Sequence, residues 1–259
     1  MRNVPGQSMP ESEPDNVIHL ASAKRRLRAT AADTHSDAIL QALREVANVR
    51  AVRPKKTLPL LTPPAVPVRL RLRVDLVGAK PPIWRRLSVP SHLTLDRLHD
   101  VLQTAFGWTN SHLHQFTLAA DPYGQETEGI LTPFDVEEGD QGVLESELRL
   151  DQFLANKGDT LHYTYDFGDD WEHTIAVEAV ESAEAGRAAD ASVRCIAGRR
   201  KGPPEDIGGI HNYEHILAVA ANPSDPEYGD LVDELAYFHL FDFTDRIDLD
   251  AINRSLGRL

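Results

Sequence analysis

The chain has 259 residues, a formal net charge of -13, 41% hydrophobic and 26% charged side chains, values that are ordinary for a globular protein. No stretch approaches the ~20 apolar residues that cross a bilayer, and the polar N-terminus lacks the apolar core of a secretion signal. A single cysteine, Cys195, excludes an intramolecular disulfide, so we predict a cytoplasmic protein without membrane contact.

The charge is distributed unevenly along the chain. Residues 1–73 hold 13 Lys/Arg and 6 Asp/Glu, a net of +7, whereas residues 74–259 hold 14 and 34, a net of -20. This pattern predicts a basic N-terminal arm on an acidic body. The basic residues between 24 and 56 suit contact with nucleic acid or an acidic protein, or with the acidic domain of the same chain. The body itself is poorly suited to non-specific phosphate binding.

The first 65 residues are predicted to form a separate, basic extension. Residues 1–15 have a disordered composition, and apolar residues recur at helical spacing near 17–28 and 36–47. Five prolines between Arg53 and Pro67 indicate a semi-extended linker. We therefore place a domain boundary there, with a largely disordered or helical extension over 1–65 and one domain over 66–259.

The domain is predicted to begin with strands and to end with helices. Strict apolar alternation predicts a strand over 66–76, followed by strands over 83–89 and 112–119 that flank a helix over 95–106. That helix has Thr94 as its N-cap and Gly107 as its terminator. An exposed excursion is expected over 120–149, and strands over 161–167 and 171–180 join at a tight turn. A Gly/Pro loop over 198–209 and helices over 212–221, 226–238 and 249–256 follow. This order predicts an α+β fold, an antiparallel or mixed sheet packed by helices.

Two histidines on the third predicted strand are candidate metal ligands. His112 and His114 lie two residues apart, which on a strand directs both side chains to one face. Such a pair suits a metal or an anionic ligand, and the alternative is two half-buried histidines bonded to backbone. His99 lies on the apolar face of the predicted helix, where a core histidine with satisfied hydrogen bonds is expected.

The polar hairpin at residues 165–173 is the densest candidate site. Asp166 and Asp170 are candidate catalytic carboxylates, Trp171 is a candidate substrate-binding residue, and His173, in phase with the apolar strand positions, is a candidate metal ligand. So many carboxylates close together need a compensating positive charge. Arg85 and Arg86 are candidates to supply it, and they would also hold an anionic substrate. The alternative is a structural turn, because aspartate is common in turns.

A second candidate element is the loop Gly202-Pro203-Pro204-Glu205-Asp206-Ile207-Gly208-Gly209. Its prolines stiffen the chain and its glycines permit close approach of a ligand. Glu205 and Asp206 are candidate catalytic carboxylates on this loop, which lacks the Gly-Lys-Ser/Thr ending of a phosphate loop. A functional loop and a rigid structural crossover both fit the sequence.

Several runs together resemble the plasmid pRiA4b ORF-3-like family. They are Gly78-Ala-Lys-Pro-Pro-Ile-Trp-Arg-Arg86, Leu98-His99, Gly107-Trp108, His112-Leu-His-Gln-Phe116, Tyr163-Thr-Tyr-Asp-Phe-Gly-Asp-Asp-Trp-Glu-His173, Pro203-Pro-Glu-Asp206 with Gly208-Gly209, and Asn253. The resemblance covers about 66–259 and implies a compact α+β domain but no established activity; some members are associated with plasmids and insertion elements. This sequence departs at Ile207, where many relatives have cysteine, and at Asn212, where glycine is usual, which argues against a thiolate ligand in that loop.

Two functions from different classes fit these residues. The first is a pocket walled by the His112/His114 strand, the Asp166–His173 hairpin and the Glu205-Asp206 loop, in which a divalent metal activates water for hydrolysis, for example of a phosphoester. The second is a non-catalytic accessory protein, for example of mobile elements, whose basic arm binds nucleic acid or a protein partner. No serine nucleophile, Cys-X-X-Cys pair or His-Glu-X-X-His helix supports another class of enzyme.

Overall fold

A computed structural model describes residues 58–118, 129–181, 192–237 and 246–259. By its internal contacts the chain divides into two units, Met1–Pro54 and Lys55–Leu259, and the described residues all belong to the second. The predicted basic arm at 24–56 therefore lies outside the described residues. Leu61, within the predicted extension, donates its backbone N–H to the carbonyl of Gln152 at 2.8 Å, so the end of the proline-rich segment contacts the domain.

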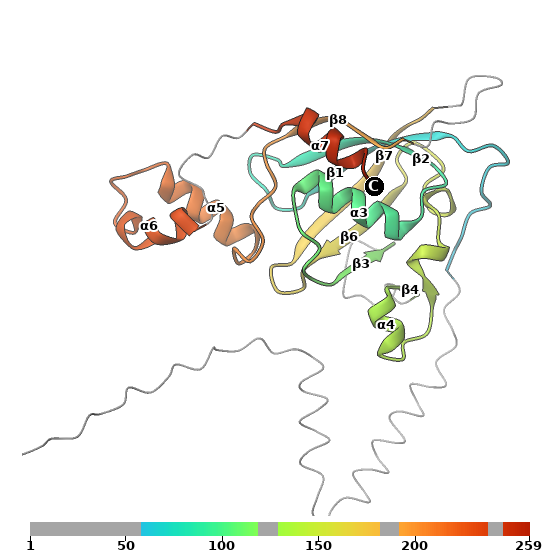
Figure 1. The fold of residues 1–259 in the computed structure, drawn as a ribbon, viewed down its shortest axis with the longest axis horizontal. Coiled ribbons are helices and arrows are strands. Elements are labelled where there is room, and N and C mark those ends of the chain that lie inside the picture. Colours follow the sequence, from blue (N-terminus) through green and yellow to red (C-terminus); the bar gives the residue numbers. More distant parts are fainter. Residues whose placement is uncertain (1–57, 119–128, 182–191, 238–245) are drawn as a thin grey trace, which may run out of the picture. The chain divides into compact units, whose positions relative to one another are not determined.

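The main sheet has six strands in the order β3-β6-β7-β1-β2-β8, and every neighbouring pair is antiparallel. Helices α3 and α7 lie over one face of it (Figure 1). Two short strands, β4 and β5, form a separate parallel pair. The α+β prediction is confirmed. The elements are β1 Arg69–Leu76, β2 Trp84–Pro90, α3 Leu95–Phe106, β3 His114–Thr117, β4 Ile130–Leu131, α4 Pro133–Glu137, β5 Val143–Leu144, β6 Thr160–Tyr165, β7 Trp171–Glu181, β8 Arg194–Arg199, α5 Gly209–Ala220, α6 Tyr228–Tyr237 and α7 Leu249–Leu256, with 3-10 turns at Glu145–Glu147 and Leu150–Gln152.

Strand β1 and helix α3 build the centre of the core. Leu70, Leu72 and Val74 of β1 are fully buried, as the alternation of apolar and charged residues predicts. Helix α3 buries one apolar stripe, and Gly107 ends it in the left-handed conformation with φ 89°, where glycine carries no steric cost. Thr94 occupies the N-cap position, but its side chain makes no capping hydrogen bond.

Apart from shifts at strand ends, such as β3 beginning at His114 rather than at residue 112, the structure differs from the predicted elements in three places. Strand β8 was not predicted, because it is a short edge strand with little alternation. Helix α5 begins at Gly209 rather than after Asn212, and the Asn212 side-chain amide instead donates to the carbonyl of Ile207 at 2.6 Å. The predicted exposed excursion contains structure within its described part, including β4 and a buried Glu145.

Asn253 of α7 holds that helix to the edge strand β8. Its side-chain amide donates to the carbonyl of Cys195 and its Oδ1 accepts from the Cys195 N–H, both at 2.9 Å. The asparagine thus satisfies both backbone groups of one residue, as a neighbouring strand would.

We expect Asn253→Ala to lower the free energy of unfolding by about 1–3 kcal/mol, because it leaves both backbone groups of Cys195 without partners. Urea unfolding followed by tryptophan fluorescence measures the change. Ser255→Ala, on the exposed side of the same helix, is the matched control and should stay within about 0.5 kcal/mol of wild type. Equal effects of the two substitutions would contradict this role of Asn253.

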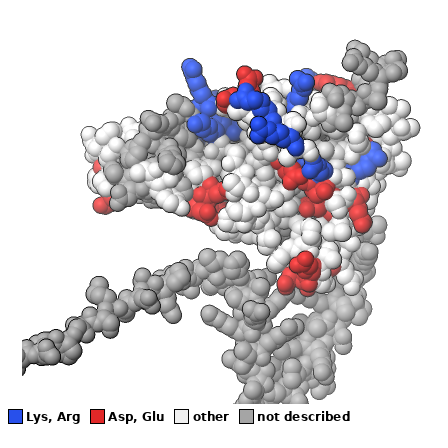
Figure 2. Space-filling model, in the orientation of Figure 1, with Lys and Arg blue, Asp and Glu red and all other residues white. Residues whose placement is uncertain are grey.

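Charged side chains are segregated on the face shown in Figure 2. Lys and Arg gather along the upper part of that face, whereas Asp and Glu form separate groups that lie mostly below them. On this face the acidic side chains are therefore concentrated in patches. Among the described helices, none has the length and apolar character needed to cross a membrane.

Candidate functional site

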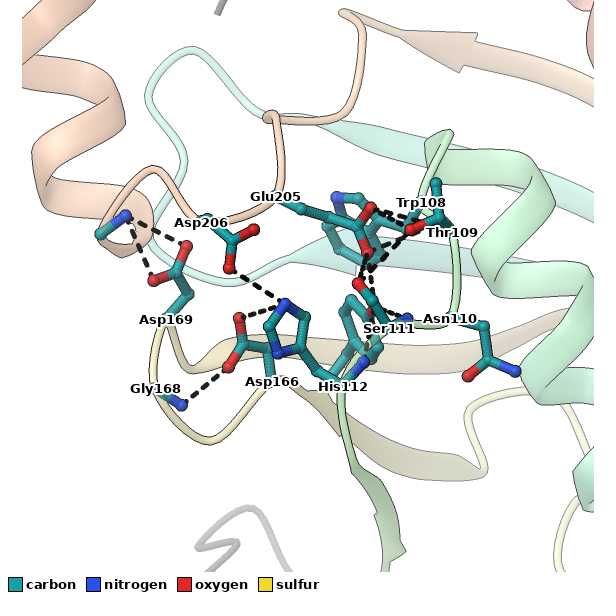
Figure 3. Close-up of polar contacts among 12 residues, drawn as sticks. Trp108, Thr109, Asn110, Ser111, His112, Asp166, Gly168, Asp169, Glu205 and Asp206 are labelled. Atoms are coloured by element: carbon teal, nitrogen blue, oxygen red, sulfur yellow. Dashed lines mark hydrogen bonds and ion pairs between the residues drawn. The ribbon is translucent and has the colours of Figure 1, made fainter. Parts of the chain in front are cut away.

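Three side chains from three separate segments converge beside the β6–β7 hairpin (Figure 3). The Nε2 atom of His112, just before β3, lies 3.1 Å from Oδ1 of Asp206 and 3.6 Å from Oδ2 of Asp166. One ligand atom of each residue lies within 4.8 Å of those of the other two. Nε2 of His112 is shielded from solvent and has no hydrogen-bond partner of good geometry. A histidine nitrogen and two carboxylate oxygens thus face a common point.

Both carboxylates of this cluster are held by an unusual backbone conformation. Asp166 has φ 58° and Asp206 has φ 61°, in the left-handed region that costs a non-glycine residue roughly 1–2 kcal/mol. Asp166 is anchored there, because its N–H donates to the carbonyl of Leu113 at 2.8 Å and its Oδ1 accepts from the N–H of Gly168 at 2.9 Å. Its Oδ2 is left to face His112.

Asp206 differs from Asp166 in its exposure. The side chain of Asp206 is 71% exposed, against 9% for Asp166. Within the described part of the chain, the Asp206 carboxylate accepts no hydrogen bond, so its oxygens are available to a ligand. The cluster therefore has a buried side, formed by Asp166, and an open side toward solvent.

Glu205, next to Asp206, is fully engaged in hydrogen bonds. Its carboxylate accepts from the N–H and hydroxyl of Thr109, from the hydroxyl of Ser111 and from the hydroxyl of Tyr165. Burial opposes ionisation of this group, but the hydrogen bonds from Tyr165, Thr109 and Ser111 outweigh it and lower the pKa of Glu205. A carboxylate with these partners is a poor general base, so its role in the structure is to hold the loop.

Asp169, at the tip of the hairpin, holds the start of α5. Its carboxylate accepts from the N–H of Gly208 at 3.1 and 3.2 Å, at the positive end of a helix dipole. Gly209 has φ 80°, and a Cβ there would lie 2.6 Å from the carbonyl oxygen of Asp169, so this contact requires glycine. Burial, and then the charge of Asp166, raise the pKa of Asp169.

The structure separates the two histidines that the sequence paired. His114 belongs to β3 and lies inside the domain, where its Nε2 contacts Oε2 of Glu145 at 2.9 Å and its ring stacks on His99 at 3.6 Å. His112 precedes the strand, so the two-residue alternation does not apply to it. His99 is a core histidine, as predicted, with hydrogen bonds to Tyr163 and Asn110.

Five other candidate residues lie away from the cluster. His173 is almost fully buried among the rings of Phe106, Trp108 and Tyr163. Trp171 is fully buried. Asp170 is exposed at the end of the hairpin and lies outside the three-residue cluster. The last two candidates are Arg85 and Arg86.

The two adjacent arginines point to opposite faces of the sheet. Arg85 is 1% exposed and donates to backbone carbonyls, including that of Ala105 at 2.7 Å. Arg86 lies on the outer face, paired with Glu178 at 2.5 and 2.7 Å. Neither arginine pairs with a carboxylate of the cluster, so the positive charge that we expected them to supply to these carboxylates is not found there. The alternation of side chains along β2 explains this difference from the prediction, because it directs Arg85 into the interior and Arg86 to the outer face.

Sequence reasoning missed the residues that hold the cluster in place. Thr109, Ser111 and Tyr165 were not candidates, although all three bond to Glu205. The sequence could have indicated Tyr165, because it precedes Asp166 and alternates with Tyr163 on the inward face of β6. No pattern in the sequence pairs Thr109 and Ser111 with a glutamate that lies 96 and 94 residues away, respectively.

The fold and site define an α+β protein with a histidine–carboxylate cluster at one end of an antiparallel sheet. The chain belongs to the plasmid pRiA4b ORF-3-like family, whose sequence model matches residues 69–251. It is 33% identical over 168 residues to the uncharacterized protein y4hQ of Sinorhizobium fredii (strain NBRC 101917 / NGR234), covering 63% of this chain and 79% of that protein. The crystal structure of MM3350, a protein of unknown function from Methanosarcina mazei Go1, matches with a TM-score of 0.57 and 31% identity, over 72% of this chain and 98% of that one.

Proposed function

We propose that His112, Asp166 and Asp206 bind a divalent metal ion and that the bound ion activates water for a hydrolytic reaction. The single observation that carries the proposal is the position of His112 Nε2, which faces one oxygen of each aspartate at 3.1 and 3.6 Å while it lacks a hydrogen-bond partner of good geometry. A buried polar atom without a partner is costly, and a cation between the three groups would remove that cost and the repulsion of the carboxylates.

The distances fit a small divalent ion. Bonds of about 2.0–2.1 Å in a tetrahedral site place neighbouring ligand atoms roughly 3.3 Å apart. The two distances from His112 bracket that value, and the third pair, within 4.8 Å, needs only a small movement of the exposed Asp206. One imidazole and two carboxylates suit zinc or manganese.

The number of protein ligands supports catalysis rather than a purely structural ion. Structural zinc sites are closed by four protein ligands, whereas catalytic sites have three and leave a position for water or substrate. The ion, when bound, supplies a nucleophilic water at neutral pH and polarises the bond under attack. Asp206 lies on the solvent side, so substrate would approach there, and Asp166 would hold the ion from the buried side.

A site for an anion without a metal is less well supported. The carboxylates of Asp166, Asp169 and Asp206 interact repulsively, and no arginine or lysine among the described residues pairs with them. A bare anion would meet a negative field.

An accessory role for the basic arm is a separate proposal. Its support is the net charge of +7 over residues 1–73 against -20 over the remainder, which would draw the arm to nucleic acid or to an acidic protein. Residues 24–56 lie outside the described part of the chain, so this role and the cytoplasmic location stay predictions from the sequence.

Titration calorimetry of the full chain with Zn²⁺ and Mn²⁺ tests the proposed site. We expect one site per chain, and we expect Asp206→Asn to weaken binding by at least about 100-fold, more than the roughly 10–100-fold that loss of an outer-shell partner costs. Asparagine tolerates the left-handed backbone at this position, so the fold should be kept.

Asp170→Asn is the matched control. Asp170 lies in the same hairpin as Asp166, also has a positive φ, 56°, and lies outside the cluster. We expect its substitution to change metal affinity less than about 5-fold, the effect of one nearby charge worth about 1 kcal/mol. Equal losses in the two variants, or stoichiometric binding that survives Asp206→Asn, would rule the site out.

A further inference from the structure

Tyr165 is the last residue of β6 and carries a buried ring with a hydroxyl directed toward the site. Its side chain is fully buried, and its ring stacks on that of Trp108 with centroids 5.1 Å apart. Burial, and then the hydrogen bond to Glu205, raise the pKa of Tyr165 to about 12. The hydroxyl therefore keeps its proton at neutral pH and acts as a hydrogen-bonding group.

The hydroxyl of Tyr165 uses its full hydrogen-bonding capacity on two separate segments. Its oxygen accepts from the backbone N–H of Ser111 at 3.0 Å and from that of His112 at 3.3 Å. Its O–H donates to Oε1 of Glu205 at 2.5 Å. A phenolic hydroxyl has one proton and two lone pairs, so none of its capacity is left for a ligand.

These two segments carry two of the three proposed metal ligands. His112 is itself one ligand, and Glu205 immediately precedes Asp206, another. We propose that the Tyr165 hydroxyl is a positioning group that sets the separation of His112 and Asp206 and thereby the geometry of the metal site. The inference rests on the proposed function, but the restraint on the His112 backbone can be measured without metal.

Other bonds also join the two segments, which limits the expected effect. The indole N–H of Trp108 donates to the carbonyl of Pro203 at 2.9 Å, and Thr109 bonds to Glu205. Without the Tyr165 hydroxyl the loop should stay docked, and the Ser111 hydroxyl keeps its bond to Glu205, whereas the backbone N–H groups of Ser111 and His112 lose their acceptor. The effect should thus be local to one ligand.

Tyr165→Phe removes one oxygen atom and keeps the ring that packs on Trp108. Tyr163→Phe is the matched control, because Tyr163 is also fully buried on β6 and its hydroxyl bonds to His99 at 2.8 Å and Gln103 at 3.0 Å. Both partners of Tyr163 lie on α3. Similar losses of thermal stability are expected in the two variants, since each deletes one buried hydroxyl with its hydrogen bonds.

Two measurements on the full chain separate a positioning role from a structural one. In metal-free protein, amide hydrogen exchange at Ser111 and His112 should be at least about 10-fold faster in Tyr165→Phe than in wild type and unchanged in Tyr163→Phe, because only the first loses its acceptor. In a Co²⁺ titration, Tyr165→Phe should bind about 10–100-fold more weakly, as expected when an outer-shell partner is lost, with an altered visible absorption spectrum.

Each outcome decides one of the two proposals. Unchanged exchange at Ser111 and His112, or equal weakening of Co²⁺ binding by both variants, would overturn the positioning role of Tyr165. If wild type binds no Co²⁺ while the exchange result holds, the proposed metal function fails and the positioning of His112 by Tyr165 stands.

Discussion

Replacing Arg85 by methionine is expected to lower the free energy of unfolding by roughly 3–5 kcal/mol, because several backbone carbonyls lose a charged donor and each buried group left without a partner costs about 1–3 kcal/mol. The guanidinium donates to the carbonyls of Ala105, Trp84, Arg199 and Arg200 at 2.7–3.2 Å. Methionine fills much of the volume but leaves these carbonyls without their donor. Burial lowers the pKa of Arg85 to about 10, so the side chain is still charged at neutral pH.

Arg86→Met is the matched control for this experiment. The two arginines are adjacent, but Arg86 is partly exposed and pairs with Glu178 on the outer face. A pair of this kind contributes roughly 0–1 kcal/mol. Arg85→Lys, which keeps the charge with fewer donors, should fall between the two. Equal losses for Arg85→Met and Arg86→Met in urea unfolding would contradict the assignment of Arg85 to the core.

Acidification from pH 7 to pH 5 is expected to destabilise the domain by roughly 3–4 kcal/mol through two buried histidines. Burial lowers the pKa of His173 to about 3, and burial and then the neighbouring His114 lower that of His99 to about 4, against 6.5 for an unperturbed histidine. The unfolded chain therefore takes up protons first as the pH falls. The stability conferred by each neutral histidine is complete above pH 6.5 and is lost toward the folded-state pKa, with a slope of about 1.4 kcal/mol per pH unit.

Urea unfolding at pH 7, 6 and 5 measures this dependence. His173→Asn should halve the difference in the free energy of unfolding between pH 7 and pH 5, because one of the two titrating groups is gone. This holds whatever the substitution does to the absolute stability. His215→Asn is the control for replacing a histidine outside the interior, since the His215 side chain is 50% exposed. A wild-type stability that is the same at pH 7 and pH 5 would contradict the neutral, buried state of both histidines.

Periodic parts of the fold were predictable because burial alone decides them. The alternation in β1 and the apolar stripe of α3 each identify a buried face, and Gly107 marks the helix end. Strand β8 was not predictable in the same way, because an edge strand buries little and Arg194 and Ile196 are exposed. The start of α5 depends on Asp169, a residue distant in sequence that holds the N–H of Gly208.

The sequence predicted the three segments that wall the candidate site, but not which side chains of each segment converge there. His112, Asp166 and Asp206 were each candidates from their local motifs. Their convergence depends on two left-handed aspartates and on a histidine that lies just outside its strand, and neither feature leaves a periodic signal. The same limitation made His114, His173 and Arg85 look equivalent to the residues of the cluster, although all three lie in the interior.

The position of a bound ion tests the central proposal most directly. Crystals of the full chain grown with Mn²⁺ would be measured for anomalous scattering at a wavelength where manganese contributes. The account predicts one peak bonded to Nε2 of His112 and to carboxylate oxygens of Asp166 and Asp206, at roughly 2.0–2.2 Å, and no such peak in Asp206→Asn crystals. Crystals of wild-type protein that have no peak between these three residues, or whose only manganese lies elsewhere, would contradict it.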